Sequence, residues 1–443
     1  MQEEVLKHLL ANLESNPDWK YQIKVNEWQT DFLRFYQSQT NYNISKLSTA
    51  LDVAIFKNKK AFSFSIDQPN EGKIDTAIRN ALQVIDSLPE DPDFVDVETD
   101  KTLNTEKRKV DNIAALSLES KIAVLQEVAA AASELGFEIF GTFICNYQHT
   151  RIVNSNGLDK QQWNSPIYFE VKAVKKDNQV TVLLTFGGEN FSVFKLEDFI
   201  SELRQKMNYA LYPVVDVEPG EYDVVLAPRC IAEYMSYLSG SMSAWSLDRK
   251  TSYFQDKLGE KVFPDYVNIT DNPEDPEIIS FDYNGDGHVY RPLNLVEKGV
   301  FSNFMCDNYY AYKTGLPKNG NQGDCLVLSC GDTTLDSMIK SVKKGLYISS
   351  LHYMNFINQK ETSVTGLTRD GTFLIEDGKI TKVVHNLRFT EIIARIFQNI
   401  VALENKSRTI PFSENYEMFG ISSARAPHVL VRNFNITSST RTI

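Results

Sequence analysis

Residues 224–240 constrain the fold more than any other part of the chain. Residues 224–227 form a short apolar run that predicts a buried strand. Pro228 ends this run, and proline fits the first turn of a helix but not the interior of a sheet. The next apolar side chains recur at helical spacing and are Ile231, Tyr234, Met235 and Leu238. We therefore expect a strand that leads directly into a helix with one buried face.

The other predicted elements divide the chain into two parts. The first part is expected to contain helices at 2–15, 74–88, 117–135 and 196–211, and strands at 21–25, 30–37, 48–56, 61–66, 137–145, 151–154, 167–174 and 180–186. The second part is expected to contain strands at 262–269, 289–293, 300–305, 326–328, 346–351, 371–375 and 379–384, and helices at 334–343 and 390–403. Grouped strands and helices of this kind predict an α+β fold. We expect an N-terminal α+β domain (1–216) with helices on a mixed or antiparallel sheet, and a β-rich C-terminal domain (217–443) with a few covering helices.

Charge and composition exclude several classes of protein. The net charge is −12 and the pI is about 5.2, so the chain is not expected to bind nucleic acid. No run of apolar residues is long enough to span a membrane. The acidic start, MQEEVLKHLL, does not resemble a secretion signal. Five cysteines without a CxxC pair fit free thiols in a reducing compartment, so a cytoplasmic location is expected.

Few motifs in the chain indicate a specific chemistry. Residues 282–287 (DYNGDG) resemble the first half of a calcium loop, but Leu293 stands where a bidentate Glu is needed, so a tight turn is the better interpretation. The six histidines are all more than ten residues apart, so no helical pair of zinc ligands can form. A site assembled from scattered residues, such as His352, His385 and Cys306, stays open. The chain has no GxSxG, GxxxxGK[ST] or GxGxxG motif.

Several short segments, taken in order, resemble the TldD/PmbA family, also called modulators of DNA gyrase. They are residues 89–92 (PEDP), 154–157 (NSNG), 224–228 (VVLAP), 249–252 (RKTS), 257–262 (KLGEKV), 297–300 (EKGV), the block 331–347 and 371–380 (GTFLIEDGKI). In that family the catalytic member, TldD, resembles a metallopeptidase, with HExxxH on the helix after the strand and proline and a cysteine near the C-terminus. The resemblance places the HExxxH positions near Ser236, Tyr237 and Ser241 of this chain.

The resemblance implies a PmbA/TldE-like member without its own metal site. No histidine occurs between His149 and His288, and the last cysteine is Cys330, so all three family ligands are absent. No catalytic residue, metal ligand or cofactor is therefore expected in this chain, and zinc is expected only in a TldD-like partner. Arg249 and Lys250 are candidate contacts to substrate or partner, and a solvated junction between a helix and a loop is the alternative interpretation.

Three functions stay open at this point. The resemblance implies a non-catalytic subunit that pairs with a TldD-like metallopeptidase and acts on unfolded peptides or small proteins, with a homodimer possible when the chain is alone. The second is a non-proteolytic regulatory or binding protein, as the gyrase label suggests. The third is a homodimeric hydrolase with an unfamiliar site.

Overall fold

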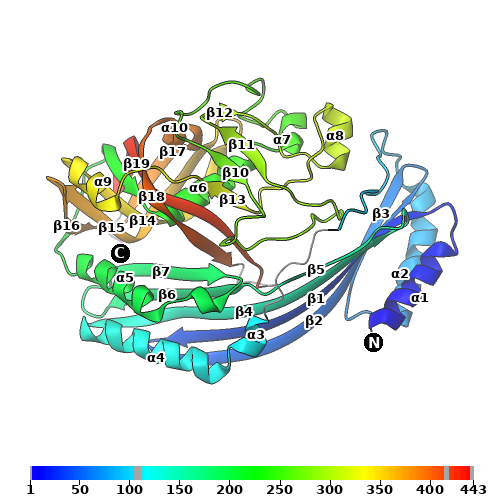
Figure 1. The fold of residues 1–443 in the computed structure, drawn as a ribbon, viewed down its shortest axis with the longest axis horizontal. Coiled ribbons are helices and arrows are strands. Elements are labelled where there is room, and N and C mark those ends of the chain that lie inside the picture. Colours follow the sequence, from blue (N-terminus) through cyan, green and yellow to red (C-terminus); the bar gives the residue numbers. More distant parts are fainter. Residues whose placement is uncertain (1, 104–110, 414–418, 440–443) are drawn as a thin grey trace.

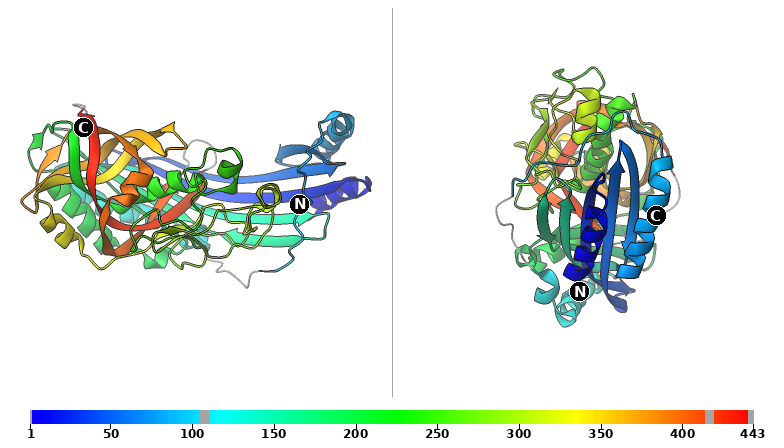
Figure 2. Two further views of the ribbon diagram at one scale, coloured as in Figure 1. Left: turned by 90° about the horizontal axis from the view of Figure 1, so that it is seen from above. Right: turned by 90° about the vertical axis from the view of Figure 1, so that its right-hand side faces the viewer.

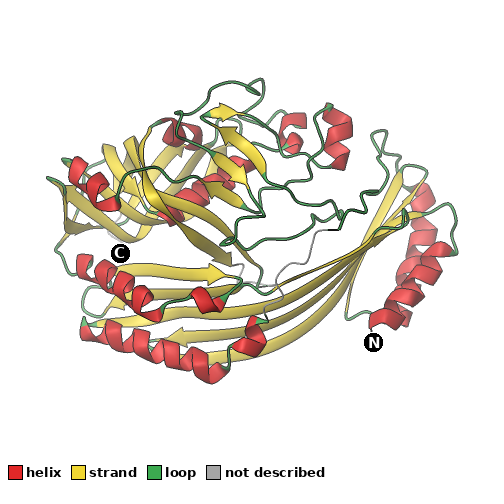
Figure 3. Cartoon of the chain, viewed as in Figure 1, coloured by secondary structure: helices red, strands yellow, loops and turns green. Residues whose placement is uncertain are grey.

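The strands form two sheets, one from each part of the chain, and helices cover portions of both (Figures 1 and 3). The computed structural model describes residues 2–103, 111–413 and 419–439. The arrangement confirms the expected α+β class. Within the described residues, no helix has the length and hydropathy to cross a membrane.

The first sheet has seven antiparallel strands in the order β3-β2-β1-β4-β6-β7, with β5 paired to β4. The elements of this part are α1 (Gln2–Glu14), β1 (Lys20–Tyr36), β2 (Gln39–Lys57), β3 (Lys60–Asp67), α2 (Glu71–Val84), α3 (Asn112–Ala115), α4 (Leu118–Glu134), β4 (Phe137–Asn154), β5 (Asp159–Asn164), β6 (Ile167–Lys175), β7 (Thr181–Gly188) and α5 (Leu196–Tyr209), with 3₁₀ turns at Ile85–Ser87 and Phe191–Val193. The long strands β1, β2 and β4 run beneath the second part of the chain, bend towards it at one end, and extend past the second sheet to the region of α1 and α2 (Figures 1 and 2). The first sheet therefore reaches well beyond the body of the molecule.

The second sheet is mixed, and twelve strands contribute to it. The elements of this part are β8 (Val214–Val215), β9 (Gly220–Leu226), α6 (Pro228–Gly240), α7 (Ala244–Asp248), β10 (Ile269–Asp271), β11 (Leu293–Glu297), β12 (Val300–Phe301), α8 (Asn308–Thr314), β13 (Leu326–Leu328), α9 (Leu335–Ser341), β14 (Lys344–Asn358), β15 (Ser363–Glu376), β16 (Lys379–Val384), β17 (Leu387–Ile392), α10 (Ile393–Gln398), β18 (Ile400–Ser413) and β19 (Ile421–Ser439). Strand β9 lies between β14 and β19, parallel to the first and antiparallel to the second. The chain therefore enters α6 from the middle of the sheet.

Local patterns explain the elements that the sequence predicted well. The strand-to-helix junction at Pro228 is confirmed, and the four apolar side chains of α6 are at most 1% exposed. Ser117 caps α4 by accepting a hydrogen bond from the Ser120 amide, which satisfies one free donor of the first turn. Antiparallel pairing of β2 with β3 confirms the hairpin expected around residues 57–60.

Several predicted boundaries were wrong. The strands expected at 21–25 and 30–37 are one strand, β1, and those expected at 137–145 and 151–154 are also one strand, β4. The helix expected at 390–403 is only α10, between β17 and β18. Most of the strand expected at 262–269 is loop, and β10 begins at Ile269. For β1, β4, β17 and β18, pairing with distant strands, which a local pattern does not show, decides the structure.

One of the hydrophobic clusters joins the two sheets. In it, Phe169 and Leu203 of the first part pack in the same cluster as Tyr347, Phe373 and Leu430 of the second part. Buried apolar side chains from both parts of the chain therefore pack together.

A polar contact also joins the two parts. The buried ammonium of Lys160, on β5, donates a 2.9 Å hydrogen bond to the Gly287 carbonyl and lies over the Tyr283 ring. Nearby, the buried carboxylate of Glu98 forms ion pairs with Lys318 and with His288. Residues 282–287, the segment that resembles a calcium loop, thus rest on β5.

Candidate functional site

Helix α6 carries a partly exposed stripe, which begins beside β6 of the first sheet at Arg229 and reaches β14 of the second sheet at Tyr237. Its other faces are buried in the core of the second part, so only a few side chains are available for chemistry. The stripe consists of Arg229, Glu233, Ser236, Tyr237 and Gly240, which recur at helical spacing. The remaining residues of α6 pack on β19, β14 and β18 of the second sheet, which fix the position of the stripe.

Charged side chains from β6 and β15 surround the first turns of this stripe. The Arg229 guanidinium lies 3.5 Å from the Glu233 carboxylate. On β6, the Tyr168 hydroxyl donates a 2.5 Å hydrogen bond to Glu170. We call these four residues, together with the ion pair between Lys172 and Asp370 (2.7 Å), the interdomain charged cluster.

The cluster perturbs the titration of its members. Burial raises the pKa of Glu233 to about 7, although the positive charge of Arg229 works in the opposite direction. Burial also raises the pKa of Tyr168, and the neighbouring Glu170 carboxylate adds to the effect. Burial opposes the charge of Arg229, but the carboxylate of Glu233 raises its pKa, so the guanidinium stays protonated. The cluster therefore holds a carboxyl that can be neutral near pH 7 beside a permanent positive charge.

The residues near the family's HExxxH positions do not meet at one point. Ser236 is exposed on the stripe. Tyr237 donates a hydrogen bond to the Met354 carbonyl, and its ring lies 5.0 Å from that of Phe356. Ser241 is buried just after α6. Its hydroxyl accepts a 2.6 Å hydrogen bond from the Tyr253 amide, so it fixes a loop and does not face the first sheet.

The candidate contact residues, Arg249 and Lys250, lie elsewhere. Arg249 caps the end of α7, and its guanidinium lies 5.0 Å from the centre of the Trp245 ring. Lys250 follows it and is exposed in a left-handed backbone conformation. Neither residue contributes a contact to the interdomain charged cluster.

These residues do not fit a zinc site. Zinc in proteins is bound by deprotonated cysteine, histidine or carboxylate side chains, whereas two serines and a hydrogen-bonded tyrosine occupy the corresponding part of this chain. The scattered alternatives do not meet either, because His352 accepts a hydrogen bond from Arg369 and His385 lies beside Asp216. Over residues 2–103, 111–413 and 419–439, no three His, Cys, Asp or Glu side chains form a group that could hold a metal ion.

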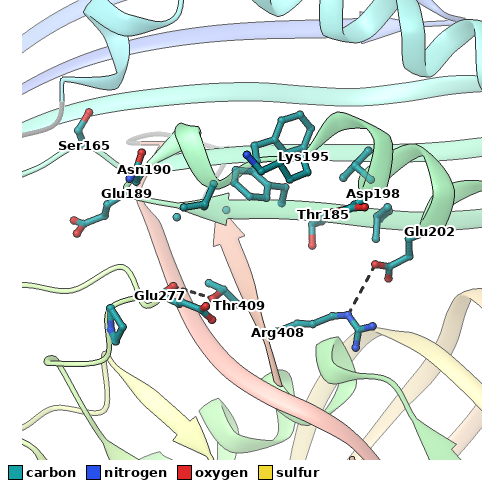
Figure 4. A pocket seen from close by; sticks show the side chains of 18 residues that line it. Ser165, Thr185, Glu189, Asn190, Lys195, Asp198, Glu202, Glu277, Arg408 and Thr409 are labelled. Atoms are coloured by element: carbon teal, nitrogen blue, oxygen red, sulfur yellow. Dashed lines mark hydrogen bonds and ion pairs between the residues drawn. The ribbon is translucent and has the colours of Figure 1, made fainter. Parts of the chain in front are cut away.

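A cavity of about 430 Å³ opens beside the outer edge of β7 (Figure 4). Residues 184–188 of β7 form one wall, and the rings of Phe194 and Phe199 contribute apolar surface. The ion pair between Glu202 and Arg408 closes one end at 3.9 Å, and Figure 4 shows both side chains pointing towards each other from α5 and β18. The size lies within the range of pockets that bind small ligands or short peptide segments.

A buried hydrogen-bonded chain lies behind that end of the cavity. Arg408 donates to the Glu404 carboxylate at 3.2 Å. Glu404 in turn accepts from Nδ1 of His428 at 2.6 Å, and the Tyr347 hydroxyl donates to Nε2 of His428 at 3.1 Å. Burial lowers the pKa of His428, which is therefore neutral at pH 7. The exposed fraction is at most 6% for each of Tyr347, Glu404 and His428. These hydrogen-bonded side chains therefore position Arg408 and do not contact a substrate.

Sequence reasoning missed the interdomain charged cluster. Arg229 and Glu233 stand four residues apart on a predicted helix, and that spacing could have indicated a pair. The other members come from β6 and β15, which are far away in the sequence. Nothing local marks these residues as neighbours of α6.

Comparison with known proteins finds relatives that are described as metalloproteases. A family model described as the PmbA/TldA metallopeptidase C-terminal domain matches residues 219–438. A zinc metalloprotease TldD homolog from Saccharolobus solfataricus is 23% identical over 348 residues, which cover 72% of this chain and 76% of that protein. A metalloprotease PmbA homolog from Haemophilus influenzae is 20% identical and covers 80% of each chain.

Solved structures have the same fold over nearly the whole chain. The crystal structure of TldE from Thermococcus kodakarensis superposes with a TM-score of 0.85 at 18% identity and covers 98% of this chain and 99% of that one. A protein from Thermotoga maritima, described as a candidate modulator of a DNA gyrase, superposes with a TM-score of 0.84 at 18% identity and covers 99% of this chain and 100% of that one. At such low identity the superpositions establish the fold.

Proposed function

The chain belongs to the TldD/PmbA family, and we propose that it is a non-catalytic, PmbA/TldE-like subunit of a TldD/TldE-type metallopeptidase complex. The observation that carries the proposal is the stripe of α6. The residues near the HExxxH positions, Ser236 and Tyr237 on the stripe and Ser241 just after it, are not the histidines and general base that a metallopeptidase needs there. Helix, strand and proline are retained as a scaffold, and the metal ligands are supplied by a TldD-like partner.

In this complex the chain helps to hold an unfolded peptide or a small protein. The outer edge of β7 supports this role, because β7 pairs only with β6 among the described strands. An extended peptide can add to such an edge through backbone hydrogen bonds, with little dependence on its sequence. The cavity beside β7 gives room for side chains, and Phe194 and Phe199 offer them an apolar surface.

The first experiment measures zinc and peptidase activity in the purified chain, alone and after co-expression with a TldD-like chain that carries HExxxH. We expect no stoichiometric zinc and no cleavage by the chain alone, and chelator-sensitive cleavage by the complex. Near-stoichiometric zinc together with chelator-sensitive cleavage by the chain alone would refute the proposal.

A matched pair of variants tests the role of the cavity. Thr185→Trp fills the space beside β7, and Leu211→Trp places the same ring at a position that is 44% exposed and outside the cavity lining. We expect Thr185→Trp to lower peptide cleavage by the complex at least about tenfold without changing its zinc content. Equal cleavage by the two variants would refute a role of the cavity in holding the peptide.

The other two functions give different outcomes in the same experiments. A regulatory protein of DNA gyrase should co-purify with a topoisomerase subunit and not with a chain that carries HExxxH. A homodimeric hydrolase with an unfamiliar site should cleave peptides when it is alone and without zinc.

A further inference from the structure

The cavity beside β7 combines an apolar wall with carboxylates from α5. Phe194 and Phe199 belong to the wall, and their ring centres lie 5.6 Å apart. Asp198 and Glu202 stand one turn apart on α5, so their carboxylates lie on the same side of the helix, and both residues line the cavity. Figure 4 shows Glu202 pointing from α5 towards β18. An occupant of this part of the cavity therefore contacts both aromatic rings and carboxylates.

The two carboxylates are not neutralised by the basic residues around them. Among the described residues, Asp198 has no lysine, arginine or histidine within ion-pair distance. Glu202 lies 3.9 Å from the Arg408 guanidinium, but the same guanidinium also pairs with Glu404 at 3.2 Å. The two consecutive carboxylates on α5 therefore share only part of one positive charge.

The rest of the cavity is acidic as well. Four carboxylates and two basic side chains line it, and they belong to Glu189, Asp198, Glu202, Glu277, Lys195 and Arg408. Just outside the lining, the guanidinium of Arg425 pairs with both Glu277 and Asp275. Each of the two guanidinium groups thus serves two carboxylates. The Lys195 ammonium donates a 3.4 Å hydrogen bond to the Ser192 carbonyl. The excess of negative charge favours a cationic occupant.

We propose that the cavity binds a lysine or arginine side chain of the peptide that adds to β7. These side chains pack a long apolar stem on apolar surface and keep a charged head in a polar environment. Here the stem lies on Phe194 and Phe199, and the head lies beside Asp198 and Glu202. Backbone pairing with β7 depends little on sequence, so the cavity is what gives the subunit a preference for basic peptides. The inference rests on the proposed function for the peptide as ligand, and it adds the class of peptide.

Binding of capped peptides to the purified full-length chain, measured by fluorescence anisotropy, tests the preference without any cleavage. The labelled peptides are uncharged except at one central position, which holds lysine, norleucine or glutamate. Norleucine keeps the apolar stem of lysine and lacks its ammonium. We expect the lysine peptide to bind at least about tenfold more tightly than the norleucine peptide, because a hydrogen-bonded charge pair is lost. The glutamate peptide should bind most weakly, and salt should reduce these differences.

Two variants with the same change in net charge test the position of the site. Asp198→Asn removes a carboxylate from the cavity, and Glu197→Gln removes one from the same turn of α5 but outside the lining. Both variants lose a similar interaction with the N-terminal end of the helix dipole. We expect Asp198→Asn to lower the affinity for the lysine peptide at least about fivefold and to leave the norleucine peptide unaffected. Glu197→Gln should change neither affinity.

Three results overturn the inference. The first is equal binding of the lysine and norleucine peptides. The second is an equal effect of Asp198→Asn and Glu197→Gln, which would assign the preference to the overall negative charge. The third is a chain that binds none of the peptides, because the cavity lies wholly within this chain.

The binding results and the cleavage results fail independently. If the complex with a TldD-like chain cleaves peptides and the lysine and norleucine peptides bind equally, the proposed function stands and this inference is wrong. If the lysine peptide binds preferentially at the cavity and the complex cleaves nothing, the preference stands and the proposed function is wrong.

Discussion

The contact between β7 and β18 gives a prediction that the structure makes quantitative. A Cβ atom at Gly187 would lie 2.3 Å from Cβ of Pro411 and 2.7 Å from its Cγ, far inside the distance at which carbon atoms pack favourably. The neighbouring Gly188 has no atom within 4 Å of such a Cβ. Neither glycine has a positive φ, so alanine fits the backbone at both positions.

The expected magnitude follows from the difference between the two alanine variants. Both substitutions reduce the entropy of the unfolded chain, which stabilises by about 0.4–1 kcal/mol. Gly187→Ala also forces β18 away from β7, and such overpacking costs about 1–3 kcal/mol. We therefore expect Gly187→Ala to be less stable than Gly188→Ala by about 1–3 kcal/mol.

Urea denaturation followed by tryptophan fluorescence measures this difference through the transition midpoints at unchanged slope. Pro411→Gly removes both clashing atoms, so the double variant with Gly187→Ala should recover most of the loss. If Gly187→Ala and Gly188→Ala have equal midpoints, the contact between the two strands is not as close as described.

The remaining predictions concern other polar groups. Burial lowers the pKa of His428 from its ordinary 6.5. The hydrogen bond from His428 lowers the pKa of Glu404, although burial opposes this effect. On acidification the unfolded state therefore takes up more protons than the folded state. The free energy of unfolding should therefore fall between pH 7 and pH 5, by at most about 1.4 kcal/mol per pH unit for one group, and His428→Gln should flatten this slope in denaturation curves. Asn284→Ala should cost about 1–3 kcal/mol, because Oδ1 accepts from the amides of Asp286 and His288 and Nδ2 donates to the Gly320 carbonyl. Asp286→Ala should change stability by less than about 0.5 kcal/mol, and calcium should not raise the melting temperature of the unmodified chain.

The elements that the sequence predicted are those whose cause is local. The junction at Pro228 follows from a short apolar run, a proline and helical spacing, all within about 15 residues. The cap at Ser117 likewise depends on the next three residues. Such features depend on residues that are close in the sequence and not on pairing with distant strands.

The elements that the sequence missed depend on distant partners. Residues 146–150 lie between two strands that the sequence predicts separately, yet β4 continues through them because residues 26–30 of β1 pair with them. His149, for example, pairs with Glu27 at 2.7 Å. The interdomain charged cluster has the same origin, since β6, α6 and β15 meet only in the folded chain. A single sequence does not contain that information in any one window.

Strand β1 has a mechanical consequence, because it belongs to two separate cores. Ile23 and Val25 pack under α1 and α2, whereas Leu33 and Phe35 pack near α4. The 17 residues of the strand span about 55 Å at 3.3 Å per residue. Strand β1 is hydrogen-bonded to β2 and β4 along most of its length, which stiffens this span. The first sheet therefore sets the distance between the N-terminal helices and the part of the molecule that contains α6.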